Sequence, residues 1–443
     1  MRLRPAALAA LTAALCFPAQ ARPPLAPTSP TAPTETAAPQ RAGSVFTLDD
    51  AFARIGDAHP DLRLFGGQRR VLEAERDGAA QRPALVGGVS VENIFGSGAL
   101  SGVKGAEITL SLASVFERGG KLDARRTFAQ SRIDALAVER ESRRLDLLAE
   151  TARRYLAVLA AQRRIELAQF DIGQRKRSVE AARVRLQAGA SPESGLLTAQ
   201  AAQARAELDR ARGERSLLAA RQHLAALWGE RDPDFATVAG DPYALPQIED
   251  AAALAGLLDR NPELGRFVDA RRIGEARVRL AQSQASPDLD WQVGLRRLQD
   301  GNDMALIGSV SMPLGARARA EPGIRGAQAE LALLDIEREA KGLSLYSTLV
   351  EAHGRYRVGA LEVARLKDDV LPRMVRAEKA AEYAYRAGAI SYLELALLQA
   401  ESVAVRTQRL DAALDAQLAL IEIQRLTGES FLAASPIPAG ATR

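Results

Sequence analysis

The sequence is poor in the residues from which catalytic and metal sites are usually built. It has one cysteine, three histidines and four methionines in 443 residues, and aromatic residues make up 5% of it. His59, His223 and His353 lie far apart, and none has cysteine or carboxylate partners at the spacing of a zinc or iron site. The "GGK" at 119–121 lacks the rest of a phosphate loop. We therefore expect no enzyme activity, no cofactor and no bound metal.

The single cysteine, Cys16, falls in a segment with the features of a secretory signal. Two early arginines precede an apolar run from Ala6 to Phe17, and a small-x-small site ends at Ala21. Cleavage there predicts a signal peptide at 1–21 and a mature chain without disulfides. The alternative is a lipidated Cys16, although the preceding Leu15 is larger than such sites prefer. Cleavage also removes two positive charges from a net +4, so the basic pI is no argument for nucleic acid binding.

Long apolar runs are absent as well. Residues 22–44 form a Pro/Thr/Ala-rich leader that we expect to be disordered, and no later run reaches the roughly 18 apolar residues of a membrane-spanning helix. Any insertion into a membrane must therefore use strands. Alanine, leucine, arginine and glutamate dominate the composition, which predicts a mainly α fold with long helices.

The chain contains an internal repeat with an offset of about 200 residues. The clearest pair is "LQAGASPESGLLTAQ" at 186–200 and "YRAGAISYLELALLQ" at 385–399, and a second pair is "HPDLRLF" and "NPELGRF". The predicted organisation has five parts after the signal: the leader at 22–44, repeat 1 at 45–229, a Pro/Asp-rich linker at 230–250, repeat 2 at 251–428 and a tail at 429–443.

Each repeat has the same predicted order of helix, strand, strand, long helix, glycine turn and helix. Five residues of the first long helix follow coiled-coil spacing: Leu145, Leu148, Ala152, Tyr155 and Leu159. Gly173 and Pro372 occupy equivalent positions in the two long helices, and each residue type interrupts or bends a helix. We therefore predict a break in both.

Strands are predicted at about 84–95, 105–116, 288–299 and 304–314 because apolar and polar residues alternate there. One apolar and one polar face per segment is typical of membrane barrel strands. Four strands are too few to close a barrel, and an open edge in lipid leaves backbone groups without partners, so several subunits must pool their strands. The alternative is a soluble β patch at the end of a helical bundle.

The doubled layout, together with three short phrases, resembles the TolC-like outer-membrane efflux proteins. The phrases are "FERGGKLDARR" at 116–126, "VEN" at 91–93 and "RLQAGASP" at 185–192, and they are most similar to the CzcC-like heavy-metal efflux branch. The resemblance implies a homotrimer with a twelve-stranded barrel in the outer membrane and a coiled-coil α-barrel crossing the periplasm. It also implies a membrane-fusion adaptor and an inner-membrane, proton-driven RND-type pump as partners.

The resemblance assigns the glycine phrases to hairpin turns at the periplasmic end of the tunnel. Gly189 and Gly388 suit a tight turn that needs a positive φ angle, and Ala190 and Ala389 are small enough for an adaptor to approach. Their simpler interpretation is as ordinary glycines that end a helix, and the two are compatible.

The resemblance also implies two gate residues. Glu394 matches an acidic position that rings the pore, where three carboxylates would attract cations, and Tyr385 matches a tyrosine that ties neighbouring helices together. This chain departs from some relatives at Gly195, Ile390 and Leu397, which stand where those proteins have charged gate residues. The simpler interpretation of Glu394 is a solvated glutamate on a helix surface.

Three functions remain open from the sequence. The first is a passive conduit that exports divalent heavy-metal cations. The second is the same channel carrying drugs, dyes or, in type I secretion, proteins. The third is a soluble periplasmic coiled-coil scaffold that crosses no membrane.

Overall fold

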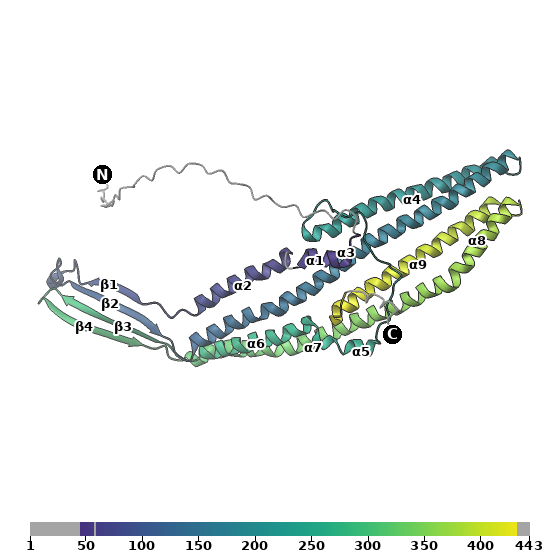
Figure 1. Cartoon of the computed structure of the whole chain (residues 1–443). Coiled ribbons are helices and arrows are strands. Elements are labelled where there is room, and N and C mark those ends of the chain that lie inside the picture. Colours follow the sequence, from purple (N-terminus) through teal and green to yellow (C-terminus); the bar gives the residue numbers. More distant parts are fainter. Residues whose placement is uncertain (1–44, 57–58, 432–443) are drawn as a thin grey trace, which may run out of the picture. The chain divides into compact units, whose positions relative to one another are not determined.

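The computed structural model describes residues 45–56 and 59–431, and Figure 1 gives their arrangement. The predicted signal peptide, the leader and the tail beyond residue 431 lie outside the described residues. The helices are α1 (Leu48–Ile55), α2 (Pro60–Ala79), α3 (Lys121–Gln187), α4 (Glu193–Ala225), α5 (Ala251–Ala255), α6 (Pro262–Ser283), α7 (Ala316–Arg365), α8 (Leu371–Arg386) and α9 (Tyr392–Thr427). The strands are β1 (Val86–Glu92), β2 (Glu107–Phe116), β3 (Leu289–Leu298) and β4 (Asp303–Ser311).

The prediction of a mainly helical fold with four strands is confirmed. The order α2-β1-β2-α3-α4 in the first half returns as α6-β3-β4-α7-α8-α9 in the second, as expected for a duplicated unit. No helix in the described part of the chain is both long and apolar enough to cross a membrane.

The four strands form one antiparallel sheet in the order β1-β2-β3-β4. Val89, Leu110, Leu295 and Leu306 pair across the strands in a single row, and each is more than half exposed. The row on the opposite face contains Thr109 beside Arg296, whose Nε donates to the threonine hydroxyl at 3.0 Å. The predicted faces are therefore present, and the apolar face is exposed in the described part of the chain.

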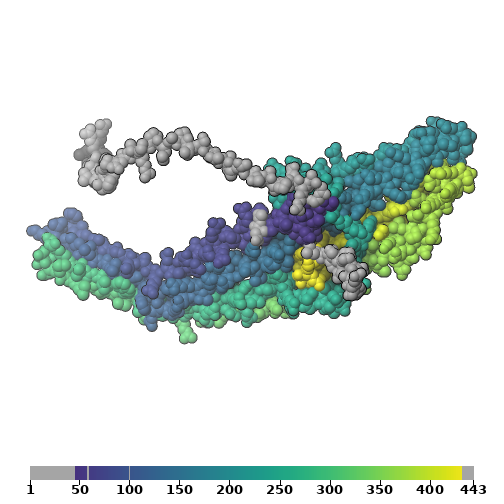
Figure 2. All heavy atoms as spheres, in the orientation of Figure 1, coloured from purple at the N-terminus to yellow at the C-terminus, as the bar shows by residue number. Residues whose placement is uncertain are grey.

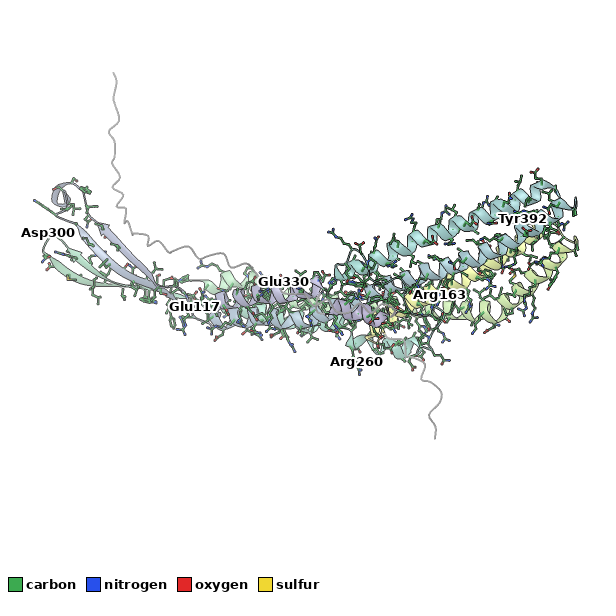
Figure 3. All side chains as sticks on the ribbon, turned by 45° about the horizontal axis from the view of Figure 1, so that its top comes forward. Glu117, Arg163, Arg260, Asp300, Glu330 and Tyr392 are labelled. Carbon is green, nitrogen blue, oxygen red and sulfur yellow. The ribbon has the colours of Figure 1, made fainter. Side chains whose placement is uncertain are left out.

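The sheet extends from one end of the helices. Figure 3 labels Asp300, between β3 and β4 at the far end of the sheet, and Glu117, where β2 passes into α3. The helices pack side by side on the other side of that junction, with α3 against α2, α4, α6 and α9, and α7 against α6 and α9.

The predicted break at Gly173 is wrong. α3 runs without interruption for 67 residues, about 100 Å, through Gly173. Glycine keeps its backbone N–H and costs a helix only about 1 kcal/mol, an amount that packing along both sides of α3 offsets. In the second half the α-helix is interrupted just before Pro372 by a π-helical segment, η5 (Leu366–Val370). Proline lacks the N–H and crowds the preceding turn, which accounts for the interruption here, whereas Pro322 lies in the second turn of α7 and is tolerated there.

The linker between the halves is part of the core. Its Phe235 stacks on Phe46, with ring centroids 4.3 Å apart, and its Val238 is buried in the same cluster. The hydroxyl of Tyr155 on α3 donates to the carbonyl of Ala239 at 2.7 Å. Burial raises the pKa of this tyrosine, so the hydroxyl stays a donor. The linker is thus fixed against the long helix.

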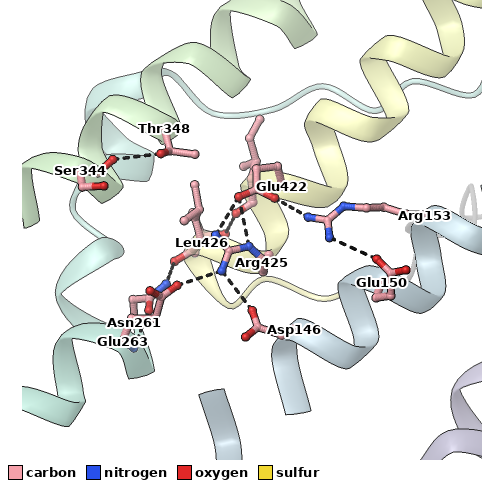
Figure 4. Close-up of polar contacts among 12 residues, drawn as sticks. Asp146, Glu150, Arg153, Asn261, Glu263, Ser344, Thr348, Glu422, Arg425 and Leu426 are labelled. Atoms are coloured by element: carbon pink, nitrogen blue, oxygen red, sulfur yellow. Dashed lines mark hydrogen bonds and ion pairs between the residues drawn. The ribbon is translucent and has the colours of Figure 1, made fainter. Parts of the chain in front are cut away.

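Arg425 near the end of α9 joins three helices (Figure 4). Its guanidinium donates to Glu422 at 2.8 Å, to Glu263 of α6 at 2.9 Å and to Asp146 of α3 at 3.2 Å. Arg153 of α3 donates to the other oxygen of Glu422 at 2.6 Å. Burial alone would raise the pKa of Glu422, but these bonds hold the pKa below its usual range. The last helix of the chain is therefore anchored to the long helix of the first half.

Candidate functional site

The two glycine phrases form the turns that connect α3 to α4 and α8 to α9. Both turns lie at the same end of the helices, opposite the sheet (Figures 1 and 2). They also contact each other, because Nη1 of Arg185 on α3 donates to the backbone carbonyl of Tyr385 on α8 at 2.6 Å. We call residues 185–199 and 384–399 together the turn end.

The two turns end their first helices in the same way. Gly189 has φ 68° and Gly388 has φ 82°, both in the left-handed region that glycine alone adopts easily. The N–H of Ala190 bonds to the carbonyl of Arg185 at 2.9 Å, and the N–H of Ala389 bonds to that of Ala384 at 2.8 Å. In addition, the N–H of Gly189 bonds to the carbonyl of Leu186, and the N–H of Gly388 bonds to that of Tyr385. The two kinds of bond together define a Schellman motif. The predicted positive φ angles are therefore present.

The returning helices begin differently. In the second turn Ser391 and Glu394 form a capping box, in which the carboxylate accepts from the Ser391 N–H at 2.7 Å and the serine hydroxyl accepts from the Glu394 N–H. The equivalent positions in the first turn are Pro192 and Gly195, and no side chain caps that helix. The capping carboxylate at the turn end thus comes from the second turn alone, because the exposed Glu193 in the first turn caps no helix.

The structure places Glu394 on the surface of the first turn of α9. The bonds from the Ser391 N–H and hydroxyl hold the pKa of its carboxyl below the usual range, so it is ionised at neutral pH. Leu393 and Leu397 are exposed beside it. The Ser-x-x-Glu motif in the sequence indicates this capping box, which was not among the predictions above.

Tyr385 is buried inside the turn end, 1% exposed. Its ring lies edge-on to Tyr392, with centroids 6.2 Å apart, and the Arg185 guanidinium lies 4.9 Å from its centroid. Burial raises the pKa of its hydroxyl, which has no hydrogen-bond partner in the described chain. Tyr385 therefore holds α8 and α9 against α3 through its ring and its backbone carbonyl. Figure 3 labels Tyr392 at this end of the molecule.

A buried polar network behind the turns was not predicted. Glu378 of α8 accepts from the amide of Gln174 on α3 and, at 2.9 Å, from the hydroxyl of Ser402 on α9. A second bond, from the amide of Gln399 to the hydroxyl of Ser178, spans α9 and α3 at 2.9 Å. Ser, Gln and Glu at inward positions of a helix are the only signal in the sequence, and it does not identify their partners. The network fixes the two hairpins to each other.

The remaining predicted site residues lie where an approaching protein could reach them. Ala190 and Ala389 are exposed at the apex of their turns. In the described part of the chain, no group of three or more His, Cys, Asp or Glu residues is arranged to hold a metal ion.

Comparison with known proteins identifies relatives of this chain. The family described as outer membrane efflux protein matches residues 70–230. The cobalt-zinc-cadmium resistance protein CzcC of Cupriavidus metallidurans is 31% identical over 280 residues, which cover 63% of this chain and 67% of the relative. Protein CyaE of Bordetella pertussis is 30% identical over 261 residues, 55% of each chain.

Solved structures share the fold at lower identity. A crystal structure of CusC, described in terms of transmembrane channel formation, superposes with a TM-score of 0.73 at 18% identity and covers 86% of this chain and 92% of its own. The outer-membrane channel OprN gives a TM-score of 0.70 at 20% identity, covering 86% and 90%. The arrangement of helices and strands described above is therefore that of these channels.

Proposed function

Because this chain belongs to the outer membrane efflux protein family, whose members are channels with a periplasmic helical extension rather than enzymes, we propose that it exports divalent heavy-metal cations. The observation that carries this proposal is the 31% identity with a protein named for resistance to cobalt, zinc and cadmium. The chain would act as a passive conduit, and the choice of cargo would be made by its partners.

The proposed assembly is a homotrimer. The sheet has two unpaired edges, β1 and β4, and a row of exposed apolar side chains on one face. Backbone groups at an open edge have no partner in hydrocarbon, so the edges must pair with other strands there. Three copies would supply twelve strands for one barrel, whose apolar face would meet lipid and whose polar face would line the pore.

The turn end is the proposed docking and gating region. The exposed Ala190 and Ala389 at the two apices would meet a periplasmic membrane-fusion adaptor, which would connect the channel to an inner-membrane RND-type pump. Glu394, ionised and exposed, would present three carboxylates in a trimer and favour cations over anions. Tyr385 would hold the second hairpin against the first in the closed state.

Growth of a deletion strain tests the cargo. We expect loss of the protein to lower tolerance to cobalt, zinc, cadmium or nickel while tolerance to dyes and detergents is unchanged, and a plasmid copy to restore it. Unchanged metal tolerance together with lost dye tolerance would instead support the second candidate, a channel for drugs, dyes or secreted proteins. That candidate is retained because CyaE, the other relative, is not named for a metal.

Fractionation tests the assembly separately. We expect heat-modifiable trimers in the outer-membrane fraction. Recovery of the chain in the soluble periplasm would support the scaffold and contradict both channel functions.

A further inference from the structure

The positive charge of this chain is concentrated where the sheet joins the helices. We define the junction belt as the ten residues on the helical side of each strand: 76–85, 117–126, 279–288 and 312–321. The belt contains nine basic and five acidic residues, an excess of four, and the whole chain has a net charge of +4. The rest of the full sequence is therefore neutral overall, and it has a net charge of −2 once the predicted signal peptide with Arg2 and Arg4 is removed.

Several of the basic side chains in the belt are free to bind a ligand. Lys121 pairs with Asp288 at 2.7 Å, and Arg125 pairs with Glu117. The exposed basic side chains without an ion pair in the described chain are Arg82, Arg118, Arg279, Arg317 and Arg319, of which Arg319 donates to the carbonyl of Leu314. Ion pairs within the described residues thus engage four of the five acidic residues of the belt, all but the exposed Glu321, and five of its arginines remain without an ion pair.

A groove of about 580 Å³ lies between α2, α3 and α6 at this junction. Its lining includes Arg76, Arg126, Arg272 and Arg279, against Asp134 and Glu275. The acids are engaged: Asp134 accepts from Gln130 at 2.8 Å, and Glu275 pairs with Arg271 at 3.2 Å. Three of the arginines also have ion pairs outside the groove lining, Arg76 with Asp77 at 3.0 Å, Arg126 with Asp123 at 3.9 Å and Arg272 with Asp269 at 3.1 Å, and Arg279 has none in the described chain.

Two of these arginines stand close to the ends of the strands. Arg126 lies about 8 Å along α3 from its first residue, and Arg279 lies about 6 Å from the end of α6. Residues 117–120 separate β2 from α3, and residues 284–288 separate α6 from β3, so both arginines lie on the helical side of the strand ends. Their long side chains can extend toward the headgroup layer when the exposed apolar face of the sheet is in lipid. This placement rests on the chain being an outer-membrane channel.

We propose that the groove between α2, α3 and α6 binds the phosphate of a glycerophospholipid headgroup in the periplasm-facing leaflet. Guanidinium groups bind phosphate oxygens with paired N–H donors, and a basic residue near an anionic membrane surface contributes about 1 kcal/mol. The belt as a whole would add a longer-range attraction to the same leaflet and fix the depth of the channel in the membrane.

Lipid binding to the purified full-length trimer tests this inference. The trimer in maltoside detergent is titrated with dioctanoyl phosphatidylglycerol, and bound lipid is counted by native mass spectrometry. We expect the Arg126→Gln/Arg279→Gln variant to bind the lipid about ten- to thirtyfold more weakly. The Arg126→Lys/Arg279→Lys variant keeps the charge and should lose only a few-fold.

A matched control removes two exposed arginines elsewhere. Arg355→Gln/Arg357→Gln lowers the net charge equally on α7, about 60 Å along the helix from the sheet, and should bind within twofold of the parent. Inorganic phosphate at the lipid's concentration should not displace the lipid, since a free anion lacks the acyl chains that face the sheet.

Four results would overturn the inference. They are unchanged binding in Arg126→Gln/Arg279→Gln, an equal loss in the α7 control, displacement by inorganic phosphate, or loss of the trimer in both groove variants, which would make the groove a contact between subunits. A failed metal-tolerance experiment would reject the proposed cargo and leave lipid binding intact, so the two proposals fail separately.

Discussion

The two turns of this chain end one helix identically and begin the next one differently. Gly189 and Gly388 occupy the same left-handed conformation inside the same Schellman motif. The first turn then starts its helix with Pro192 and no side-chain cap, whereas the second uses the Ser391 and Glu394 capping box. The two copies therefore share the backbone conformation of the turn and differ in the cap of the returning helix, since Glu394 belongs to a capping box and Glu193 does not.

The two hairpins also differ in the helices that lead into their turns. α3 runs unbroken to the first turn, while α7 and α8 are separated by the π-helical segment before Pro372. A π-helical segment shifts the hydrogen-bond ladder locally and often marks a functional position. The second hairpin thus has both the helix interruption and the capping carboxylate, whereas the first has an unbroken α3 and an exposed Glu193 that makes no cap.

The largest expected effect comes from separating the two hairpins. Glu378→Ala leaves the buried Gln174 amide and the Ser402 hydroxyl without their acceptor, which should cost about 3 kcal/mol. We expect amide exchange in α8 of the trimer to rise about a hundredfold, by hydrogen-exchange mass spectrometry. Glu382→Ala, one turn away, removes only pairs with Arg386 and Arg177 near the surface and should cost less than about 1 kcal/mol. Equal effects of the two variants would show that the buried network does not join the hairpins.

The next effect tests whether the two turns are equivalent. Gly189→Val and Gly388→Val each force a β-branched residue into the left-handed region, at a cost of about 2 kcal/mol. Amide hydrogen exchange, followed by mass spectrometry, should accelerate about thirtyfold in the substituted turn, and the increase should be the same in both turns.

Gly195→Ala is the matched control for these substitutions. Gly195 lies within α4 and has no positive φ, so alanine should slow exchange there by stabilising the helix by about 0.5 to 1 kcal/mol. A response in only one of the two valine variants would refute the equivalence of the turns.

These comparisons also show what could be predicted from the sequence. The strands, the turns and the positive φ of both glycines follow from local patterns, because alternation, spacing and glycine placement act within a few residues. Gly173 misled the prediction because a helix tolerates glycine when its flanks are packed, and packing is not visible locally. The Glu378 network required knowing that α3, α8 and α9 lie together, which no short pattern contains.

Two features of the turn end were missed from the sequence for different reasons, the contact of Arg185 and the capping role of Glu394. Arg185 contacts Tyr385 across 200 residues of sequence, so the contact could be found only in the fold. The capping role of Glu394 was readable in its own Ser-x-x-Glu motif. Its proposed role in the pore remains a prediction, because one carboxylate serves the cap here and would serve the ring in a trimer.

Removing the charge of Glu394 and adding one at position 195 of the first turn tests the proposed ring of carboxylates in the pore. Glu394→Gln keeps a side chain that can complete the capping box but removes the charge, while Glu394→Ala removes both. In planar bilayers we expect both variants to lose cation preference to the same extent, with fraying of α9 only in the alanine variant. Gly195→Glu, made in the Glu394→Gln channel, adds a second carboxylate to the first turn beside Glu193, at the position equivalent to 394, and should restore part of the cation preference. Unaltered ion selectivity in all three variants would leave Glu394 with its capping role alone.

The smallest expected effect is the acid response of the second turn. The bonds from the Ser391 N–H and hydroxyl lower the pKa of Glu394, so its stabilisation of the cap is fully present above the ordinary glutamate pKa and is lost as the pH falls through the lowered value. Cation preference should therefore stay constant from about pH 7 to 5 and decline only below about pH 4. Ser391→Ala removes the hydroxyl but not the N–H, so the decline should begin at a higher pH in that variant. The first turn has an exposed Glu193 but no carboxylate in a cap, so a Glu394→Gln channel should show no change over the same range. A decline of equal size there would assign the acid response to another carboxylate, Glu193 included.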